Sequence, residues 1–445
     1  MQNIVIPDKV KKIMDMFLKN GAEIYVVGGA VRDLLLGRVV KDWDFTTNLT
    51  PDEMKKLFSK NSFCNNEFGT FSIIGKNKEI FEVTTFRTEK GYSDNRHPDE
   101  VKWGKSLKED LSRRDFTINA LVLRPAQDKP ELIDLYNGQK DLEDKLIRTV
   151  GNPDERFKED ALRMMRAIRI AGQIGFNVEE KTLLSIQKNA ELINNVAGER
   201  IRDELFKILL CSNPSFGIEL LKQSRLLTKI MPELIEGLGM TQKGHHIDDV
   251  WTHNLKTLDN CQTQNPITKL AALLHDVGKP KSMHGEGEKR TFHNHEVYGS
   301  RIAVQIGKRL RLSNKELDQL FRLVRWHMFT VQETQTDKAV RRFIRNVTVD
   351  YIDEMIALRR ADRLGSGAKE TSWRWELFKK RIVEVQKQPF AVKDLKVNGE
   401  DVMKILNIKP GRKVGEVLNA IFKEVEEEPE LNKREILLER IKSFE

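Results

Sequence analysis

The spacing of apolar residues changes part-way along the chain, and this change restricts the possible fold most. In the first part, short apolar and β-branched runs typical of strands alternate with turns. The clearest of these runs are 71–74, 80–85 and 120–123. From about residue 152 to 235, apolar residues recur at i, i+3 and i+4, which predicts amphipathic helices. The sequence therefore predicts a segment built on strands, followed by helical segments.

Two further helical regions follow, and they differ in composition. Eight of the nine histidines lie between His245 and His327, and histidine is the commonest metal ligand in proteins. Residues 390–445 are short, helical and charged. A chain of 445 residues is long enough for several domains with buried cores.

Charge, cysteines and hydropathy limit the class of protein. The formal net charge of +9 suits an acidic partner such as RNA, although charge alone is weak evidence. Cys64, Cys211 and Cys261 lie far apart, so we expect reduced thiols and neither a disulfide framework nor a zinc finger. Residues 1–12 lack the apolar core of a signal peptide, and no apolar run approaches the roughly 18 residues of a membrane span. We expect a cytoplasmic protein that has no membrane partner.

A glycine turn followed by two aspartates indicates a site for phosphate and metal. Gly28 and Gly29 follow the first predicted strand, and Arg32 lies one turn into the next helix. Glycine lets backbone N–H groups approach a phosphate, and the guanidinium can bind a triphosphate oxygen. Asp42 and Asp44 alternate on a predicted strand, so both carboxylates should point to one side. Such a pair repels unless a cation lies between, and oxygen ligands beside phosphates favour Mg²⁺.

A third acid is expected at the same site. Glu82 interrupts the otherwise apolar and β-branched run 81–87, so we assign it to the catalytic group. A lone GG pair would be read as a simple turn, and a lone DxD as a solvated loop. Because the two occur together, we predict nucleotidyl transfer, in which Mg²⁺ activates a hydroxyl and stabilises the leaving pyrophosphate.

Four segments form a pattern that is more specific than any single motif. They are GGAVRD with DWD (28–44), SRRDFTINA (112–120), RFKEDALRMMRAIR (156–169) and GERIRDELFKIL (198–209). In this order and spacing they resemble the class II tRNA nucleotidyltransferase and bacterial poly(A) polymerase family. The resemblance implies an α+β fold, with a mixed-sheet nucleotidyltransferase head followed by an all-α neck, body and tail. We place the head at 1–150 and the helical neck, an RNA-binding region, at 151–238.

The resemblance also implies roles in a nucleotide pocket. Arg114 would contact phosphate, together with Gly29 and Arg32. Asp115 and Asn119 would hydrogen-bond ribose hydroxyls. The alternative for the segment around Arg114 is an ordinary helix start with arginines in solvent.

Asp160 and Arg163 allow base selection to be argued from chemistry. At i and i+3 of a predicted helix they share a face, where the carboxylate accepts and the guanidinium donates. Cytosine and adenine present an amino donor beside a ring-nitrogen acceptor, whereas guanine and uracil present the reverse. The pair therefore selects C and A without a template, because a wrong base leaves buried polar groups unsatisfied. Arg166 would reach the phosphates or base from the same face. The alternative is an exposed salt bridge of little energetic worth.

Residues 86–101 resemble the flexible loop that the family has between the catalytic strand and the ribose motif. The resemblance implies that relatives adding only C lack this loop. Its presence predicts addition of the full CCA or of A alone, and it does not separate these two activities.

The histidine-rich region contains a second motif. His253 precedes His275 and Asp276, and Asp362 follows in ADRLG. This H…HD…D order resembles the HD phosphohydrolase superfamily. Imidazole and carboxylate suit a divalent transition metal, whose bound water becomes a nucleophile near neutral pH. One buried histidine would usually be a satisfied core residue, but HDxGK with these partners is difficult to obtain from packing alone.

Three more residues belong to this predicted HD site. His295 and His327 could hold a second metal or a phosphate, and Lys279 could hold the substrate phosphate. Met328 stands where some relatives have Asp, so the ligand set stays open. We place the HD-type helical domain at 239–375. The alternative is a catalytically inactive body that binds tRNA.

The C-terminal helical tail, placed at 376–445, offers a further contact with RNA. In NIKPGRKVGEV (407–417), Arg412 and Lys413 lie at a predicted helix start. Backbone amides and two cations could hold an RNA phosphate there, although a capped loop with solvated cations explains the segment equally well.

Together these motifs predict template-independent addition of CCA to the 3′ end of tRNA, from CTP and ATP. The expected cofactors are Mg²⁺ and, at the HD site, a divalent transition metal whose identity stays open. The expected partners are tRNA, ATP and CTP, with no obligate protein partner. The alternatives within the family are an A-only tRNA nucleotidyltransferase and a poly(A) polymerase. The alternative of another class is a metal-dependent phosphohydrolase with an RNA-binding N-terminal half.

Overall fold

The computed structural model describes most of the chain and divides it into two compact units. The described residues are 4–58, 62–64, 70–75, 78–90, 100–103, 106–126, 129–242, 248–285, 287–329, 336–386 and 392–444. The first unit comprises Met1–Ile235 and Lys308–Leu312, and the second comprises Glu236–Gly307 and Ser313–Glu445.

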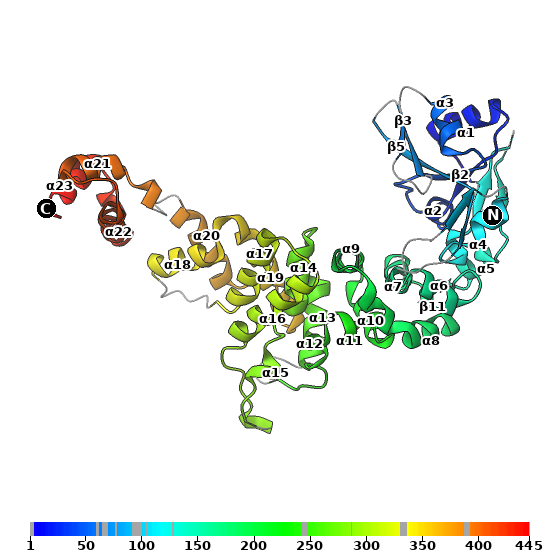
Figure 1. Ribbon diagram of the computed structural model, residues 1–445. Helices are drawn as coiled ribbons and strands as arrows, with labels where there is room; N and C mark the ends of the chain where they lie inside the picture. The colour runs from blue at the N-terminus through cyan, green and yellow to red at the C-terminus, as the bar shows by residue number, and fades with distance from the viewer. Residues whose placement is uncertain are drawn as a thin grey trace. The chain divides into compact units, whose positions relative to one another are not determined.

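A mixed sheet forms the head of the first unit (Figure 1). Among the described residues its strands are, in sheet order, β3 (Ser62–Cys64), β4 (Thr70–Ile74), β5 (Ile80–Thr85), β2 (Asp44–Thr47), β1 (Ile24–Val27), β8 (Val122–Arg124) and β9 (Glu131–Ile133). β2 and β5 run parallel, and the other neighbours are antiparallel. The predicted mixed sheet is confirmed, and the strand runs at 71–74 and 80–85 are in it.

Short helices and one hairpin complete the head. Helix α1 (Asp8–Lys19) buries Val10, Ile13, Met14 and Phe17, whose spacing places them on one face. The other elements are α2 (Gly29–Leu35), α3 (Pro51–Leu57), α4 (Leu107–Ser112), the 3₁₀ helix η1 (Thr117–Asn119), α5 (Gly138–Glu143) and the hairpin β6 (Arg87–Lys90) with β7 (Glu100–Trp103). The predicted flexible loop at 86–101 falls partly on this hairpin, and its residues 91–99 lie outside the described residues.

Helices make up the rest of the first unit, as the periodicity predicts. They are α6 (Pro153–Glu159), α7 (Leu162–Ile174), α8 (Glu180–Asn189), η2 (Ala190–Asn195), α9 (Gly198–Leu209), α10 (Pro214–Gln223), α11 (Leu227–Ile230) and α12 (Pro232–Ile235). A two-stranded parallel pair, β10 (Leu146–Ile147) and β11 (Asn177–Val178), precedes α8. α7 packs against α9 and α10, and its buried residues include Met165 and Ile168.

In the second unit, the regular elements among the described residues are all helices, apart from two isolated β-bridges. Its first part contains α13 (Val250–Asn260), α14 (Pro266–Leu274), α15 (Lys279–Ser282), η3 (Gly287–Lys289), α16 (His295–Arg309), α17 (Asn314–Trp326), α18 (Asp337–Val347), η4 (Val349–Tyr351), α19 (Ile352–Gly365) and α20 (Trp373–Gln386). α13 packs against α14 and α19, and α14 also packs against α17. Nearly every residue of α14 is buried, so this helix lies at the centre of the helical core.

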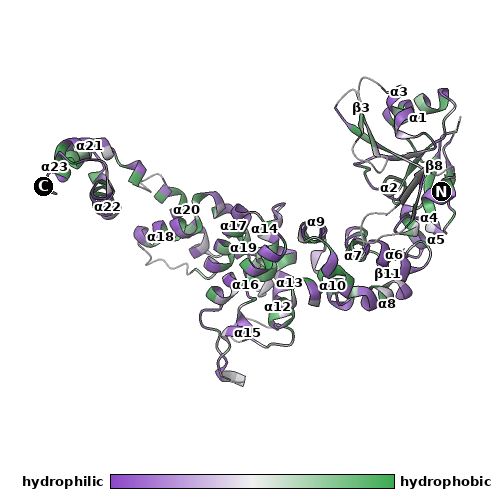
Figure 2. Cartoon of the chain, viewed as in Figure 1, coloured by the Kyte–Doolittle hydropathy of each residue, from purple (hydrophilic) through white to green (hydrophobic). Residues whose placement is uncertain are grey.

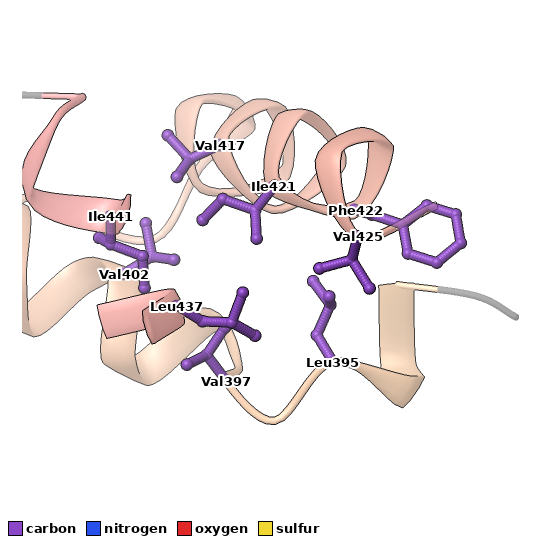
Figure 3. Packing of buried hydrophobic residues seen from close by; sticks show 9 residues of the cluster. All are labelled: Leu395, Val397, Val402, Val417, Ile421, Phe422, Val425, Leu437 and Ile441. Carbon is purple, nitrogen blue, oxygen red and sulfur yellow. The ribbon is translucent and has the colours of Figure 1, made fainter. Parts of the chain in front are cut away.

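The last helices have a small apolar core of their own (Figure 3). The elements are η5 (Val392–Asp394), α21 (Gly399–Leu406), α22 (Arg412–Glu427), η6 (Pro429–Leu431) and α23 (Arg434–Lys442). Val402, Ile421, Val425 and Leu437 lie in this core. The helix start predicted near Arg412 is confirmed by the first residue of α22.

Hydropathy along the helices agrees with this packing. In Figure 2, green and purple residues alternate around helices such as α20 and α22, as expected when each helix buries one face. Among the described residues, no helix has the length and apolar content that crossing a membrane requires.

Candidate active site and metal centre

The two innermost strands of the sheet bring two acidic residues together. β2 and β5 are parallel, and their register sets Asp44 directly opposite Glu82. Burial raises the pKa of Asp44, the Arg114 guanidinium opposes this effect, and the charges of Glu82 and Asp42 raise the pKa further. Glu82 and Asp42 therefore both lie within electrostatic reach of Asp44.

Asp42 does not lie on a strand, contrary to the prediction that it alternates with Asp44. β2 begins at Asp44, which pairs with Val27 at the end of β1. Beyond Val27 the chain turns at Gly28, where φ is +77°. Asp42 therefore has no β1 residue opposite it that could continue the ladder.

The glycine turn lies against one acid, Asp44, and one arginine, Arg114. A Cβ atom at Gly28 would lie 3.4 Å from Arg114 Nη1 and 3.8 Å from Asp44 Oδ2. The positive φ of Gly28 is a conformation that glycine adopts without strain. α2 then begins at Gly29, and the buried Arg32 side chain donates a hydrogen bond to Asn119 Oδ1 at 3.0 Å.

A chain of hydrogen bonds connects the predicted phosphate and ribose residues. Asn119 Nδ2 donates to Asp115 Oδ1 at 3.1 Å, and Arg166 Nε donates to Asp115 Oδ2 at 2.9 Å. Burial alone would raise the pKa of Asp115, but the charge of Arg166 and the hydrogen bond from Asn119 hold it well below its ordinary value. Asp115 is therefore ionised at neutral pH and holds Asn119 and Arg166 in place.

Asp110 is a further residue of this site, and the sequence analysis missed it. Its fully buried carboxylate accepts hydrogen bonds from Arg113 Nε at 3.0 Å, Arg114 Nη2 at 3.2 Å and Thr46 Oγ1 at 3.2 Å. The available signal was an acid three and four residues before two arginines, which follow the end of α4.

Asp160 and Arg163 do not share one continuous helix, which corrects the i, i+3 prediction. α6 ends at Glu159 and α7 begins at Leu162, and Asp160 between them is extended, with φ −142° and ψ 105°. Asp160 Oδ1 accepts a hydrogen bond from the backbone N–H of Leu162 at 3.1 Å. Short acidic side chains compete in this way with helix continuation.

Both members of the predicted base-selecting pair have other partners in this structure. Asp160 Oδ2 accepts from Arg200 Nη2 at 3.1 Å, and Arg163 Nη1 donates to Glu159 Oε2 at 2.5 Å. Arg166 lies within electrostatic reach of both regions. Its positive charge lowers the pKa of Asp44, and the negative charge of Asp160 raises the pKa of Arg166. Arg200, in the segment GERIRDE, was not predicted as a site residue.

The second unit brings the six predicted metal ligands of the HD site into one buried cluster. His253, His275 and Asp276 form one group whose ligand atoms could hold a metal ion, and Asp276, His295 and His327 form another. Asp362 Oδ1 lies 3.2 Å from His253 Nε2 and so adjoins the first group. All six side chains are buried.

Charges inside this HD cluster keep its acids ionised. Burial would raise the pKa of Asp276, but Lys279 and His275 hold it well below its usual range. Lys279 Nζ donates to Asp276 Oδ2 at 2.5 Å and also to Gln242, so in this structure it contacts a ligand residue. Ionised oxygens and imidazole nitrogens facing one another are the donor set that divalent transition metals prefer.

Two other histidines of this region lie outside the cluster. His284 and His293 are exposed. His245 and His246 lie outside the described residues.

Comparison with known proteins identifies the family. The "Poly A polymerase head domain" model matches residues 24–148, "Probable RNA and SrmB- binding site of polymerase A" matches 175–238, and "HD domain" matches 250–366. The CCA-adding enzyme of Ligilactobacillus salivarius is 34% identical over 444 residues, which cover 99% of this chain and 98% of the relative. The chain belongs to the CCA-adding enzyme family. The CCA-adding enzyme of Enterococcus faecalis is 33% identical, with 98% and 97% covered.

A solved structure of another CCA-adding enzyme has the same fold. The Bacillus stearothermophilus CCA-adding enzyme, crystallised in complex with CTP, superposes with a TM-score of 0.71 at 26% identity, covering 99% of both chains. The suspected family, the fold class and the presence of an HD domain are thereby confirmed. A CCA-adding family member with a nucleotidyltransferase head and an HD domain uses divalent metal ions.

Proposed function

We propose that this chain adds C and A nucleotides to the 3′ end of tRNA without a template, using CTP, ATP and Mg²⁺. The observation that supports this most is the pairing of Asp44 with Glu82 across two parallel strands, beside the Gly28 turn. The named relatives along nearly the whole chain support the same activity. Because its substrates are cytoplasmic, we infer a cytoplasmic location.

Each residue of the head has a defined part in this proposal. Asp42 and Asp44 would hold Mg²⁺, which when bound neutralises the triphosphate and favours ionisation of the attacking hydroxyl. Glu82 adds negative charge at the same place. Arg32 and Arg114 bind the phosphates of the incoming nucleotide as guanidinium groups.

The ribose and the base are bound by the residues that follow. Asn119, whose amide is held by Asp115, faces the ribose hydroxyls. Asp160 accepts the amino hydrogen of cytosine or adenine, and Arg163 donates to the ring nitrogen. Guanine and uracil would place a carbonyl acceptor against the Asp160 carboxylate and an N–H donor against the Arg163 guanidinium. Neither pair can form a hydrogen bond, so these bases are excluded.

The second unit is proposed to be a phosphohydrolase. His253, His275, Asp276 and Asp362 would hold a divalent transition metal, which when bound supplies a water nucleophile near neutral pH. The burial of all four side chains supports this assignment over a surface RNA contact.

Three tRNA substrates test the transferase proposal. They end before CCA, after C and after CC, and each is incubated with labelled CTP or ATP. The proposal requires C, C and A to be added in order. Addition of A only to the CC end would indicate the A-only enzyme, and long A tracts would indicate poly(A) polymerase.

Two substitutions separate the two activities. Asp42→Ala should lower nucleotide addition by more than about 100-fold, because losing even an outer-shell partner of a metal ligand costs about 10- to 100-fold. It should leave phosphate release from a phosphomonoester unchanged. His275→Ala should do the reverse. A chain with phosphatase activity but no nucleotide addition would support the phosphohydrolase with an RNA-binding N-terminal half.

A further inference from the structure

One arginine connects the head with the neck helices of the first unit. Arg148 Nε donates to both carboxylate oxygens of Asp141 on α5, at 3.1 and 3.2 Å. Its Nη1 donates to Glu179 Oε1 at 3.1 Å, and Glu179 is the N-cap residue of α8. The exposed fraction is 5% for the Asp141 side chain and 12% for the Glu179 side chain. Two largely buried acids from different elements therefore share one cation, and we call this contact the Arg148 bridge.

On the head side, the Arg148 bridge reaches the ribose segment. Asp141 Oδ2 accepts a hydrogen bond from Thr117 Oγ1 at 2.6 Å, and Thr117 is the first residue of η1, which ends at Asn119. α5 packs closely on η1, because a Cβ atom at Gly138 would lie 2.4 Å from the Thr117 carbonyl oxygen. Close packing of this kind transmits a displacement from one element to the next. A movement of Asp141 should therefore move Asn119 as well.

On the neck side, the Arg148 bridge ends at the start of α8. Glu179 Oε2 accepts hydrogen bonds from the backbone N–H and from the hydroxyl of Thr182, each at 2.8 Å. The strand just before Glu179, β11, pairs in parallel with β10, whose last residue is Ile147. The Arg148 side chain and the backbone that precedes it thus contact the same part of the neck.

The backbone at Arg148 contacts the nucleotide pocket directly. The Thr117 N–H donates to the Arg148 carbonyl oxygen at 2.9 Å, and the Val150 N–H donates to that of Asp115 at 3.1 Å. The Asp115 side chain in turn pairs with an arginine of α7. This segment is therefore joined to the ribose segment by its main chain and to α8 by the Arg148 side chain.

We propose that Arg148 is a positioning residue for base selection, because it fixes the head relative to the neck. The proposal rests on the proposed function, in which the head binds metal and triphosphate while Asp160 and Arg163, beside the start of α7, bind the base. One nucleotide must meet both sets of groups at once, and a misplacement of about 1 Å can cost about 100-fold in rate. Without Arg148, two buried carboxylates lose their shared cation and repel each other, so the two sets of groups shift apart.

The ratio of kcat/KM for CTP over UTP measures this role. We expect Arg148→Ala to lower the ratio about tenfold. Loss of folded protein lowers both kcat/KM values equally, so the ratio reports positioning and not stability. Arg148→Lys keeps the charge but lacks the planar fork that reaches two acids, so it should restore only part of the ratio. An unchanged ratio in Arg148→Ala would overturn the proposal.

The matched control is Arg124→Ala. Arg124 pairs with Glu131 inside the head, and its side chain is 49% exposed, against 42% for Arg148. Its removal takes away an arginine–carboxylate pair without touching the neck, so this variant should leave the CTP/UTP ratio unchanged. An equal fall in Arg124→Ala would contradict a role specific to the Arg148 bridge.

A double-mutant cycle shows whether Arg148 acts through the base-selecting pair. Asp160→Ala alone should already lower the CTP/UTP ratio. Adding Arg148→Ala should then lower it little further, because residues that act on the same contact are not additive. Fully additive losses would overturn the proposal.

Hydrogen–deuterium exchange of the full-length chain measures the Arg148 bridge without any reaction. Arg148→Ala should speed exchange in peptides that cover η1 and the start of α8, whereas Arg124→Ala should not. Unchanged exchange in both places would overturn the proposal. Faster exchange in Arg148→Ala, together with a wild-type chain that adds no nucleotide, would refute the proposed function while supporting the bridge.

Discussion

At the scale of single residues, buried carboxylates determine where the arginines of the nucleotide site lie. Asp110 holds Arg113 and Arg114, and Asp115 holds Arg166. Burying these acids is unfavourable by itself, and the arginine charges compensate for it. Guanidinium groups held in this way would lose less conformational entropy on binding the nucleotide of the proposed reaction.

The substitution Asp110→Asn should destabilise the head. It leaves Arg113 and Arg114 without their shared anion, so we expect the free energy of unfolding to fall by about 3 kcal/mol at pH 7. The pKa of Asp110 is lowered in the folded chain because the charges of Arg114 and Arg113 outweigh the effect of burial. The stabilisation is thus present above the unfolded pKa of about 3.9 and is lost as pH falls through the folded value.

Urea unfolding at pH 7 and pH 3 checks both parts of this prediction. The difference between the wild-type chain and Asp110→Asn should shrink at the lower pH. Glu109→Gln, an exposed neighbour on α4, is the matched control and should change little. An equal difference at both pH values would contradict the ion-pair explanation.

Arg200 should contribute to base selection as a positioning residue. Its guanidinium pairs with Asp160, and without it the carboxylate can turn away from the base. For Arg200→Ala we expect the ratio of kcat/KM for CTP over UTP to fall about tenfold, which corresponds to about 1.4 kcal/mol. Arg200→Lys should restore part of this ratio. The matched control is Arg202→Ala, because Arg202 lies on the same helix and pairs with Asp203. This variant should leave the CTP/UTP ratio unchanged. An unchanged ratio in Arg200→Ala would refute the positioning role.

At the scale of elements, regular patterns were predictable and interruptions were not. The strands at 71–74 and 80–85 follow from β-branched and apolar runs, and the neck helices follow from i, i+3, i+4 spacing. The sequence around Asp160 predicts one helix, because the apolar residues keep their helical spacing on both sides of the break between α6 and α7. The break depends on a side-chain hydrogen bond to Leu162 and on Arg200, 40 residues away. Partners at such separation leave no local pattern.

Two roles of Asp160 should be separable by substitution: its hydrogen bond to the Leu162 N–H at the start of α7 and its proposed contact with the base. Asp160→Asn can still accept the hydrogen bond of Leu162 N–H, because Asn and Asp are similarly good caps. We expect its unfolding free energy to change little, while discrimination against UTP weakens. Asp160→Ala should lose both discrimination and about 1 kcal/mol of stability. Thermal unfolding and nucleotide incorporation assays distinguish the two variants, and normal discrimination in both would remove Asp160 from the base site.

At the scale of the whole molecule, two compact units each contain their own cluster of titratable groups. Asp42 and Glu82 of the first cluster are exposed, whereas the histidines and acids of the second cluster are buried. The order of motifs predicted both clusters, because their acids and histidines occur in recognisable sequence patterns. The pattern did not reveal Asp110 or the direct contact of Lys279 with Asp276, since both depend on burial and packing.

Metal ions should stabilise the second unit independently of the head. A ligand at 100 times its dissociation constant adds about 2.7 kcal/mol to a folded state that binds it. In calorimetry of the metal-free chain, we expect Mn²⁺ to raise one transition in both the wild-type protein and Asp42→Ala. His275→Ala should abolish that rise. A rise of equal size in His275→Ala would place the bound ion elsewhere.

The proposed catalytic acid at the start of β2 is tested most directly by single-turnover addition of CTP to a tRNA that lacks CCA. Wild-type chain and Asp44→Ala are compared at saturating Mg²⁺, with fluorescence-monitored CTP binding and thermal unfolding measured on the same samples. The account predicts that Asp44→Ala folds and binds CTP but adds nucleotide more than about 100-fold more slowly. Addition at the wild-type rate by a folded Asp44→Ala chain would contradict it.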